Sequence, residues 1–292
     1  MAIRVRRHPA PGPAHGRPEI PEVFVIRHLL ALGLATLLVS APAFAADNTL
    51  RVCADPNYMP FSNRAGEGFE NKIAELVAKS MNRTLEYTWY SERGPGGYPE
   101  FLAKTLDAKK CDVVIDMPYG GLEELTTDPY YASSYVFVFK KNKGYDIESM
   151  DSSVLHKLKI GFEEDTPPED GLKIRDLIFD ATPFHVGDRK GESPRLMLQA
   201  VQDGKIDVMI TWEPAIGYFL KNYPDLAVVR VPNERATGSP EQYMFSMSMA
   251  VRKGDTALQQ ELNKVIARRK SQIKEILDQY NVKLFPAAGE AL

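Results

Sequence analysis

Short apolar runs alternate with amphipathic runs over most of this 292-residue chain, and this alternation constrains the fold more than any other feature. In the first half, the runs at Leu50–Ala54, Leu85–Tyr90 and 111–116 are typical of strands, whereas Glu70–Met81 and Tyr98–Ala108 have helical spacing. Strands that alternate with helices form parallel βαβ units. We therefore expect an α/β fold.

The second half of the chain repeats the pattern, with Pro, Gly or charged residues between the elements. We expect strands at Lys159–Phe162, Pro183–Gly187, Ile206–Thr211 and Leu226–Val231, and helices at Gly171–Phe179, 194–204, 214–223 and Thr256–Tyr280. Three segments, Thr127–Ser134, Glu163–Asp170 and Asn233–Pro240, are expected to be turns or loops.

Two stretches resemble each other, KKCDVVIDMPY at Lys109–Tyr119 and GKIDVMITWEP at Gly204–Pro214. A match of this length also arises by chance between unrelated βαβ units. Interpreted as a repeat, it predicts two similar lobes that face each other, joined by two buried apolar strands at Tyr135–Lys140 and Phe245–Val251. The first lobe would comprise 46–142 with 241–292, the second 143–240, with a polar hinge at Lys140–Gly144.

The first 45 residues have the pattern of an export signal preceded by a leader. Arg27 precedes the apolar run Leu29–Val39, and Ala43-Phe44-Ala45 matches a small-residue cleavage site. The run is short for a membrane span, so we favour a cleaved signal over an uncleaved anchor. We expect no membrane attachment after cleavage. Five Arg and two Glu lie in this segment, and removing their charge of +3 from the total of −3 leaves −6.

This negative charge disfavours nucleic acid as a partner, and no basic stripe with interleaved aromatic residues occurs. After cleavage only His156 and His185 remain, far apart and without ligand spacing, so we expect no histidine metal site. The acidic run Glu163–Asp170 could hold a hard cation, but it lacks EF-hand spacing and contains two Pro. We favour a solvated loop there and expect no metal site.

Cys53 and Cys111 are the chain's two cysteines. An exported protein meets an oxidising environment, which favours a disulfide. Both cysteines lie in apolar strand patterns, so a bridge would join the sheet if the strands are neighbours. Closing a loop of this length is worth roughly 3–5 kcal/mol in the chain-entropy description. A redox role is the alternative, although the chain has no CxxC motif.

The stretch Leu50–Asn63 runs from a buried strand into a loop at its carboxyl end. Ligands of open α/β sheets bind beyond the carboxyl ends of strands. The loop would therefore supply one wall of a binding crevice, with the side chains of Asp55, Asn57, Tyr58, Phe61 and Ser62. The alternative is a tight Pro-containing loop that closes over the sheet, with Phe61 as its plug.

Six features along the chain carry a resemblance to a known fold. They are ADPNYMPFSN, GFENKIAELVA, CDVVIDMP, DPYYASSYVFV, LQAVQDGKIDVMI and the long terminal helix. The chain resembles the type II periplasmic solute-binding proteins, over Asn48 to about Phe285. That resemblance implies two α/β lobes with two hinge crossings around a central cleft, in a periplasmic protein that we expect to be a monomer.

Within that fold, VCADPNYMPFSNRAGEGFENKIAE and PYYASSYVFV, together with Cys53 and Cys111, resemble one branch. It is the MxaJ/XoxJ family, whose members are encoded with PQQ-dependent methanol dehydrogenases. The resemblance implies an accessory protein that binds such a dehydrogenase and assists its activation or maturation. MxaJ/XoxJ proteins tend to have Gly where this chain has Glu213, so the resemblance does not extend to this position of the second cleft wall.

The chain departs from ordinary amino-acid binders of the same fold at both charge anchors. Those proteins hold the ligand carboxylate with a Thr-x-x-Arg element, where this chain has the Arg-free, acidic segment Gly121–Leu125. They hold the ligand ammonium with an Asp, where this chain has Trp212. An unpaired buried charge costs several kcal/mol, so free amino acids are expected to bind poorly.

We expect a cleft lined mainly by aromatic side chains. The candidate residues are Asp55, Tyr58, Phe61, Ser62, Tyr119, Tyr130, Tyr131, Trp212, Glu213 and Tyr218. Tyr and Trp are enriched where proteins bind proteins, although several of these rings could instead pack in the core.

The main functional hypothesis is therefore the accessory protein, and the alternative is a transporter-linked receptor for a small aromatic or anionic solute such as PQQ. An enzyme is the third hypothesis and the least favoured, because no nucleophile and base can be paired and no catalytic residue is assigned. We expect no bound cofactor.

Overall fold

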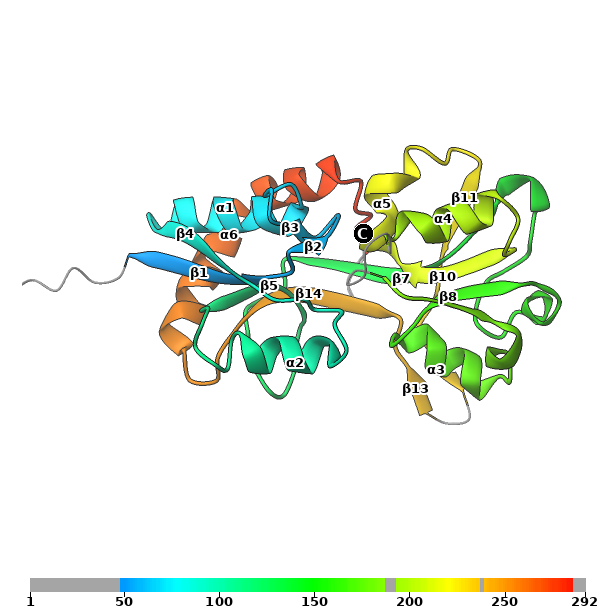
Figure 1. Cartoon of the computed structure of the whole chain (residues 1–292), viewed down its shortest axis with the longest axis horizontal. Helices are drawn as coiled ribbons and strands as arrows, with labels where there is room; N and C mark the ends of the chain where they lie inside the picture. The colour runs from blue at the N-terminus through cyan, green and yellow to red at the C-terminus, as the bar shows by residue number, and fades with distance from the viewer. Residues whose placement is uncertain (1–47, 187–192, 237–238, 286–292) are drawn as a thin grey trace, which may run out of the picture. The chain divides into compact units, whose positions relative to one another are not determined.

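The computed structural model describes residues 48–186, 193–236 and 239–285. The predicted leader and signal lie outside this part of the chain. The described residues form an α/β fold around a ten-stranded sheet (Figure 1). Eight of its strands follow the order β4-β1-β5-β14-β7-β10-β8-β9, and the other two, β11 and β6, pair with β7 and β14 off this path. The expected fold class is confirmed, since the sheet has two halves that are each flanked by helices on both faces.

The first half of the sheet is built from parallel strands, as the alternating pattern predicts. β1 (Thr49–Ala54) lies between β4 (Thr84–Trp89) and β5 (Val113–Pro118). The helices α1 (Phe69–Ser80) and α6 (Thr256–Gln279) cover one face, and α2 (Gly97–Lys104) covers the other (Figure 1). Smaller elements complete this half: β2 (Asn57–Tyr58), β3 (Ser62–Asn63) and β6 (Leu125–Thr126).

The second half has the same layered arrangement. β10 (Val208–Trp212) pairs in parallel with β8 (Ile160–Glu163), and β8 pairs in parallel with β9 (Thr182–Phe184). α3 (Pro167–Ile174) lies on one face, whereas α4 (Arg195–Gln202) and α5 (Glu213–Leu220) lie on the other (Figure 1). β11 (Leu226–Arg230) pairs with β7, and short 3-10 turns occupy Lys141–Lys143, Ser153–Lys157 and Ile178–Asp180.

Two antiparallel strands connect the halves, as the two apolar runs predict. β7 (Tyr131–Lys140) pairs with β14 (Met244–Val251) through Tyr131–Ser134, and with β10 through Tyr135–Phe139. β14 in turn pairs with β5. We call the half that contains β1 lobe 1 and the half that contains β8 lobe 2. The lobe boundaries expected from the sequence remain a prediction.

The core follows this layering. The largest cluster of buried apolar side chains lies on the α1/α6 and α4/α5 side of the sheet, and separate clusters lie under α2 and α3. The α2 cluster contains the Cys53–Cys111 disulfide. It joins β1 to the segment just before the neighbouring strand β5, with a Cα–Cα distance of 5.4 Å. The expected disulfide is therefore confirmed.

Three local predictions are wrong. β7 begins at Tyr131, inside the expected turn, because residues 131–134 find a partner in β14. The helix predicted at Gly171–Phe179 is α3, which begins at Pro167 and ends at Ile174. Pro fits the first turn of a helix because the amide N–H that it lacks has no partner there. The expected loop at Asn233–Pro240 contains a hairpin of two three-residue strands, β12 (Glu234–Ala236) and β13 (Ser239–Glu241), which are too short to show alternation.

Candidate functional site

Asp55 lies at the carboxyl end of β1 and organises the loop after it. The carboxylate accepts hydrogen bonds from the backbone N–H of Asn57 at 2.7 Å and of Glu92 at 2.8 Å. It also accepts one from Ser91 Oγ at 3.2 Å. The side chain is 1% exposed, so these donors replace the water that burial removes. Asp55 thereby ties the loop after β1 to the loop after β4.

Three other predicted cleft residues pack within the loop that Asp55 begins. Phe61 stacks on Tyr58 with ring centroids 4.6 Å apart, and it contacts Phe69 of α1 at 5.1 Å. Ser62 Oγ donates to the backbone carbonyl of Asp55 at 2.9 Å. All three side chains are buried. This packing agrees with the interpretation of Phe61 as a plug over the sheet, and contact with an occupant of the cleft remains a prediction.

A group of carboxylates lies beside Asp55 at the same edge of lobe 1. We call Asp55, Glu70, Glu92 and Asp116 the acidic cluster. Burial raises the pKa of Glu92 to about 8 and that of Asp116 to about 7, and repulsion from Asp55 and Asp116 contributes at Glu92. Burial, with repulsion from Glu92, Asp116 and Asp55, holds the pKa of Glu70 well above its usual value. Carboxylates that are crowded and poorly solvated retain protons more strongly.

The predicted tyrosines Tyr130 and Tyr131 hold Asp116 in place. Tyr131 Oη donates to Asp116 Oδ2 at 2.8 Å, and Tyr130 Oη donates to the Ile115 carbonyl at 2.7 Å and lies 3.5 Å from Asp116 Oδ1. Tyr119 behaves differently, since it follows β5 on an outer loop and is 55% exposed. Of the three tyrosines that the sequence placed together in the cleft, Tyr130 and Tyr131 therefore contact the Asp116 carboxylate, whereas Tyr119 lies at the surface.

Arg93, in the loop after β4, connects lobe 1 to lobe 2. One guanidinium nitrogen lies 3.0 Å from Glu163 Oε1, at the end of β8, and 3.2 Å from the Glu164 carbonyl. Arg93 Nε donates to the Val186 carbonyl at 3.2 Å. Glu163 is 2% exposed, and its other oxygen accepts from Thr211 Oγ1 at 3.2 Å. Burial raises the pKa of Glu163, and the charge of Arg93 opposes that shift.

Two cavities share Asp165 as a lining residue. The first, of about 570 Å³, is lined by the Glu92–Pro99 loop of lobe 1 and by Glu164, His185 and Val186 of lobe 2. We call it the Glu92 cavity. The second, of about 680 Å³, lies between α3 and the start of β14. Both volumes are in the range of small-molecule sites.

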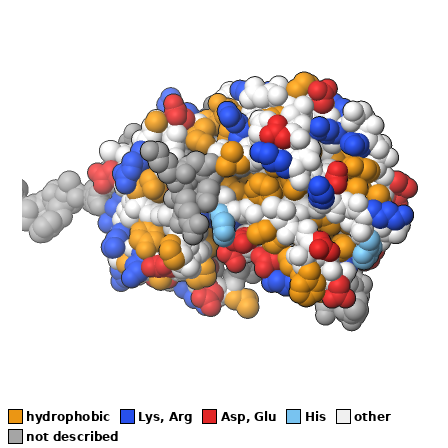
Figure 2. Space-filling model, turned by 45° about the vertical axis from the view of Figure 1, so that its right-hand side comes forward, with side chains coloured by type: hydrophobic (Ala, Val, Ile, Leu, Met, Phe, Trp, Pro, Cys, Tyr) orange, Lys and Arg blue, Asp and Glu red, His pale blue; other side chains and the backbone are white. Residues whose placement is uncertain are grey.

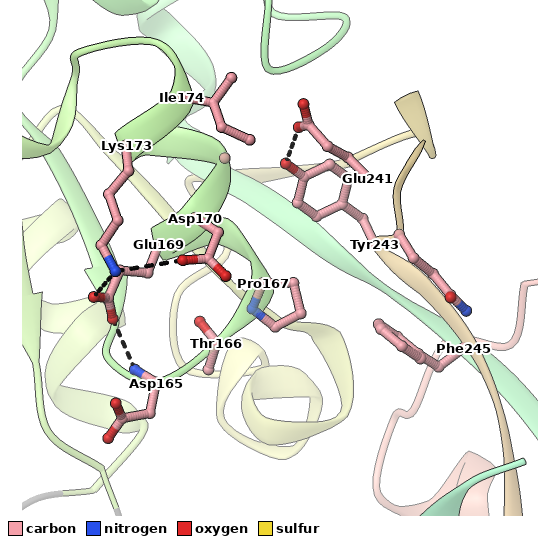
Figure 3. Close-up of a pocket in the computed structure, with 12 residues that line it drawn as sticks. Asp165, Thr166, Pro167, Glu169, Asp170, Lys173, Ile174, Glu241, Tyr243 and Phe245 are labelled. Atoms are coloured by element: carbon pink, nitrogen blue, oxygen red, sulfur yellow. Dashed lines mark hydrogen bonds and ion pairs between the residues drawn. The ribbon is translucent and has the colours of Figure 1, made fainter. Parts of the chain in front are cut away.

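Figure 3 shows the second cavity. Glu169 and Asp170 of α3 point toward Lys173, whose Nζ lies 2.7 Å from Glu169 Oε1 and 3.3 Å from Asp170 Oδ1. Across the cavity Tyr243 Oη donates to Glu241 Oε2 at 2.5 Å. The predicted acidic loop Glu163–Asp170 is thus partly buried strand end and partly helix. Glu163 pairs with Arg93, and Glu169 and Asp170 pair with Lys173, although the Asp170 side chain stays exposed.

The remaining predicted residues lie near the crossing strands. Trp212 packs against Tyr135 and Phe245 of β7 and β14, at centroid distances of 5.2 and 6.0 Å. Glu213 is fully buried, and its Oε2 accepts the Lys283 N–H at 2.9 Å. Burial raises the pKa of Glu213 to about 8.

Tyr218 contacts Tyr280 at 5.6 Å. Glu213 and Tyr218 therefore meet the segment that follows α6, and the structure does not bring them to the Glu92 cavity. Figure 2 shows Asp and Glu side chains gathered in the lower middle of the face that it presents, whereas Lys and Arg are spread over its upper right and along its left side.

Sequence reasoning missed Arg93, Glu92, Glu70 and Asp116. Two of these residues could have been found from the sequence pattern. Asp116 ends an apolar strand run, and Glu70 begins an amphipathic helix. Arg93 and Glu92 precede a Gly-rich loop. That pattern predicts a turn, but it does not indicate which side chains the two residues contact. The convergence of these charges depends on strand order, which no local pattern specifies.

Comparison with known proteins places this geometry in a family. Residues 50–283 match the bacterial extracellular solute-binding proteins, family 3. The chain belongs to this family. Among curated relatives, Protein MoxJ of Methylorubrum extorquens is 30% identical over 256 residues, covering 82% of this chain and 83% of the relative.

Two solved structures resemble this family member closely. The crystal structure of MxaJ from Methlophaga aminisulfidivorans MPT has a TM-score of 0.71 at 28% identity, covering 81% of this chain and 100% of that one. The structure of periplasmic binding protein XoxJ from Methylobacterium extorquens AM1 has a TM-score of 0.64 at 32% identity, covering 82% and 100%. Within the family, this solute-binding protein is MxaJ/XoxJ-like.

Across 48–186, 193–236 and 239–285, no three His, Cys, Asp or Glu side chains are placed to hold one metal ion. Among the same residues, no helix has both the length and the apolar character to cross a membrane.

Proposed function

We propose that this protein is a periplasmic accessory of methanol oxidation, which binds a PQQ-dependent methanol dehydrogenase and assists its activation or maturation. The observation that carries the proposal is the likeness to MoxJ, MxaJ and XoxJ over about four-fifths of the chain. The protein acts by binding and not as an enzyme. A two-lobed body with two crossing strands can close around a partner by rotation about those strands.

The chemistry of the cleft supports a role other than amino-acid binding. Arg93, whose guanidinium faces lobe 2, is already bound to Glu163 and to two carbonyls. The Gly121–Leu125 segment supplies no Arg, and Trp212 packs among aromatic rings where an ammonium partner would be needed. A zwitterion would therefore leave its charges without partners, at a cost of several kcal/mol for each buried charge.

A direct binding experiment tests the proposal. The protein and the dehydrogenase encoded beside it should form a complex detectable by calorimetry and by pull-down, with different affinities for the apo and the PQQ-loaded enzyme. The second expected readout is a higher yield of active dehydrogenase when the two are produced together. The proposal fails if neither form of the dehydrogenase binds and its activity is independent of this protein.

A receptor for a small aromatic or anionic solute such as PQQ is the second candidate, and the size of the two cavities favours it. The acidic residues around both cavities count against an anion. Thermal shift separates the two functions, because a ligand at a hundredfold excess over its Kd stabilises the folded state by about 2.7 kcal/mol. A rise in Tm with PQQ, without binding of the dehydrogenase, would favour the receptor.

A further inference from the structure

The segment that follows α6, residues 281–285, contacts both lobes, and we call it the bridging segment. Its start is fixed to lobe 1 by Tyr280, the residue that caps the carboxyl end of α6. Tyr280 Oη donates a hydrogen bond to the Glu67 carbonyl, and its ring packs against Phe69 of α1 at a centroid distance of 6.0 Å. The bridging segment therefore leaves lobe 1 from a defined point.

Two hydrogen bonds attach the bridging segment to β7, one of the strands that cross between the lobes. Ser133 Oγ donates to the Lys283 carbonyl at 3.2 Å, and the Phe285 N–H donates to the Ala132 carbonyl at 2.9 Å. Val282 is 4% exposed and belongs to the largest apolar cluster. The bridging segment is thus packed into the core at this residue and bonded on both sides of it.

The bridging segment also meets α5 of lobe 2. Asn281 Nδ2 donates to the Gly217 carbonyl at 2.9 Å, and the Lys283 N–H donates to Glu213 Oε2 at 2.9 Å. The two backbones approach closely here, since a Cβ on Gly217 would lie 2.5 Å from the Asn281 carbonyl oxygen. The absence of a side chain at Gly217 is what permits this contact.

Glu213 depends on the bridging segment for its hydrogen bonding. Its side chain is fully buried, Oε2 accepts the Lys283 N–H, and Oε1 has no hydrogen-bond partner among the described residues. A buried carboxyl group is costly to leave without any hydrogen bond. Separation of α5 from the bridging segment would therefore remove a bond that Glu213 needs.

These contacts lie on both sides of the point where β7 passes from one lobe to the other. β7 pairs with β14 through Tyr131–Ser134 and with β10 from Tyr135 onward, so the change of partner falls between Ser134 and Tyr135. The bridging segment is bonded to β7 before this point, whereas α5 follows β10 beyond it (Figure 1). A rotation of lobe 2 that bends β7 here would move α5 relative to the bridging segment.

We propose that the bridging segment is a clamp that restricts rotation of lobe 2 relative to lobe 1, and that Glu213 and Gly217 are the residues of α5 that it holds. Opening or closing of the lobes around an occupant then requires these contacts to shift. The clamp belongs to the body of the protein, so it acts whether the occupant is a dehydrogenase or a small solute.

Distances between the lobes, measured by double electron–electron resonance, test the clamp in the intact protein. Both native cysteines are in the disulfide, so spin labels can be placed through Lys79→Cys in lobe 1 and Lys205→Cys in lobe 2, at two exposed positions. Wild type should give a narrow distance distribution. Glu213→Ala and Asn281→Gly should each widen it at least about twofold, because the lobes then exchange between arrangements.

Two control variants match these changes. Glu213→Gln retains an oxygen that can accept the Lys283 N–H, so its distribution should stay as narrow as that of wild type. Asn82→Gly makes the same substitution as Asn281→Gly at another residue that follows a helix, with a φ of 55° at both positions, but within lobe 1. It should leave the distribution unchanged.

Gly217→Ala provides an independent test, because its Cβ would push α5 away from the bridging segment. It should shift the mean distance between the labels. Gly121→Ala, whose Cβ would make an ordinary contact at 3.9 Å, should not shift it.

Far-UV circular dichroism identifies the variants that fold, and the exposed position of Asn281 makes Asn281→Gly the mildest of them. A wild-type distribution in every folded variant of Glu213, Asn281 and Gly217 would overturn the proposal. Equal widening by Asn82→Gly would overturn it as well, since the effect would then not depend on a contact between the lobes.

Discussion

Arg93 of lobe 1 forms an ion pair with Glu163 of lobe 2, with 3.0 Å between the guanidinium nitrogen and Oε1. Arg93 lines the Glu92 cavity and adds two hydrogen bonds to carbonyls of lobe 2. Because Glu163 is buried and has few other donors, the contact matters more than a surface ion pair would. It connects the lobes at a distance from the strands that join them covalently.

Removing Arg93 should destabilise the protein. Arg93→Ala leaves Glu163 charged and buried, which should lower the free energy of unfolding by about 2 to 3 kcal/mol. Urea denaturation measures the loss, and small-angle scattering should show a larger radius of gyration as the lobes separate.

The double variant Arg93→Ala/Glu163→Gln should recover part of that stability, because the uncompensated charge is gone. Lys173→Ala, which removes an exposed pair with Glu169, should leave the urea midpoint unchanged. A wild-type midpoint for Arg93→Ala would show that the pair does not hold the lobes together.

Loss of the disulfide should have a larger effect. Cys53 and Cys111 are 58 residues apart, and releasing a loop of this length should cost about 4 kcal/mol in the chain-entropy description. The paired variant Cys53→Ala/Cys111→Ala should therefore unfold at a much lower urea concentration than the oxidised wild type. Adding a reductant to wild type should reproduce the shift and should not affect the variant; equal midpoints throughout would contradict the prediction.

The acidic cluster should make stability depend on pH. Glu92 and Asp116 have folded-state pKa values raised to about 8 and about 7, so the folded state binds protons that the unfolded state releases. Their contribution is complete below the unfolded pKa values and is lost as the pH rises through the folded ones. Stability should fall between pH 5 and pH 8 by on the order of 2 kcal/mol.

Denaturation midpoints measured across this pH range test the sign. Glu92→Gln/Asp116→Asn should flatten the decline. Glu213 has a pKa raised to about 8 and acts in the same direction, so Glu213→Gln should remove a separate share. Asp112 has a lowered pKa, and its opposite contribution is lost only at more acidic pH. Stability that rises from pH 5 to pH 8 would refute the prediction.

Gly68 should tolerate no side chain. A Cβ at this position would lie 1.9 Å from the backbone oxygen of Phe61, in the loop that Asp55 anchors. Gly68→Ala should therefore displace the start of α1 and lower stability by about 3 kcal/mol or more, the range of severe steric substitutions. Gly121→Ala is the matched control, because its Cβ would meet only an ordinary contact at 3.9 Å. Similar thermal melting of the two variants would contradict this account.

The local patterns predicted most of the fold. Short apolar runs marked β1 and β5, alternation marked β4, and helical spacing marked α1 and α6 to within about two residues. These elements are long enough to repeat a pattern several times. The hairpin of β12 and β13 is too short for that, and the early start of β7 depends on pairing with β14, a partner more than a hundred residues away.

The sequence by itself determined the α/β class and the disulfide partners, because the class depends on nearby spacing and the chain has two cysteines. Only the tertiary structure decided which charges meet. Glu70, Glu92 and Asp116 come from three separate segments, and Arg93 finds Glu163 across the two lobes. Parallel strands bring their carboxyl ends to one edge of a sheet, so the order of the strands, rather than any local motif, sets the charge of the cleft.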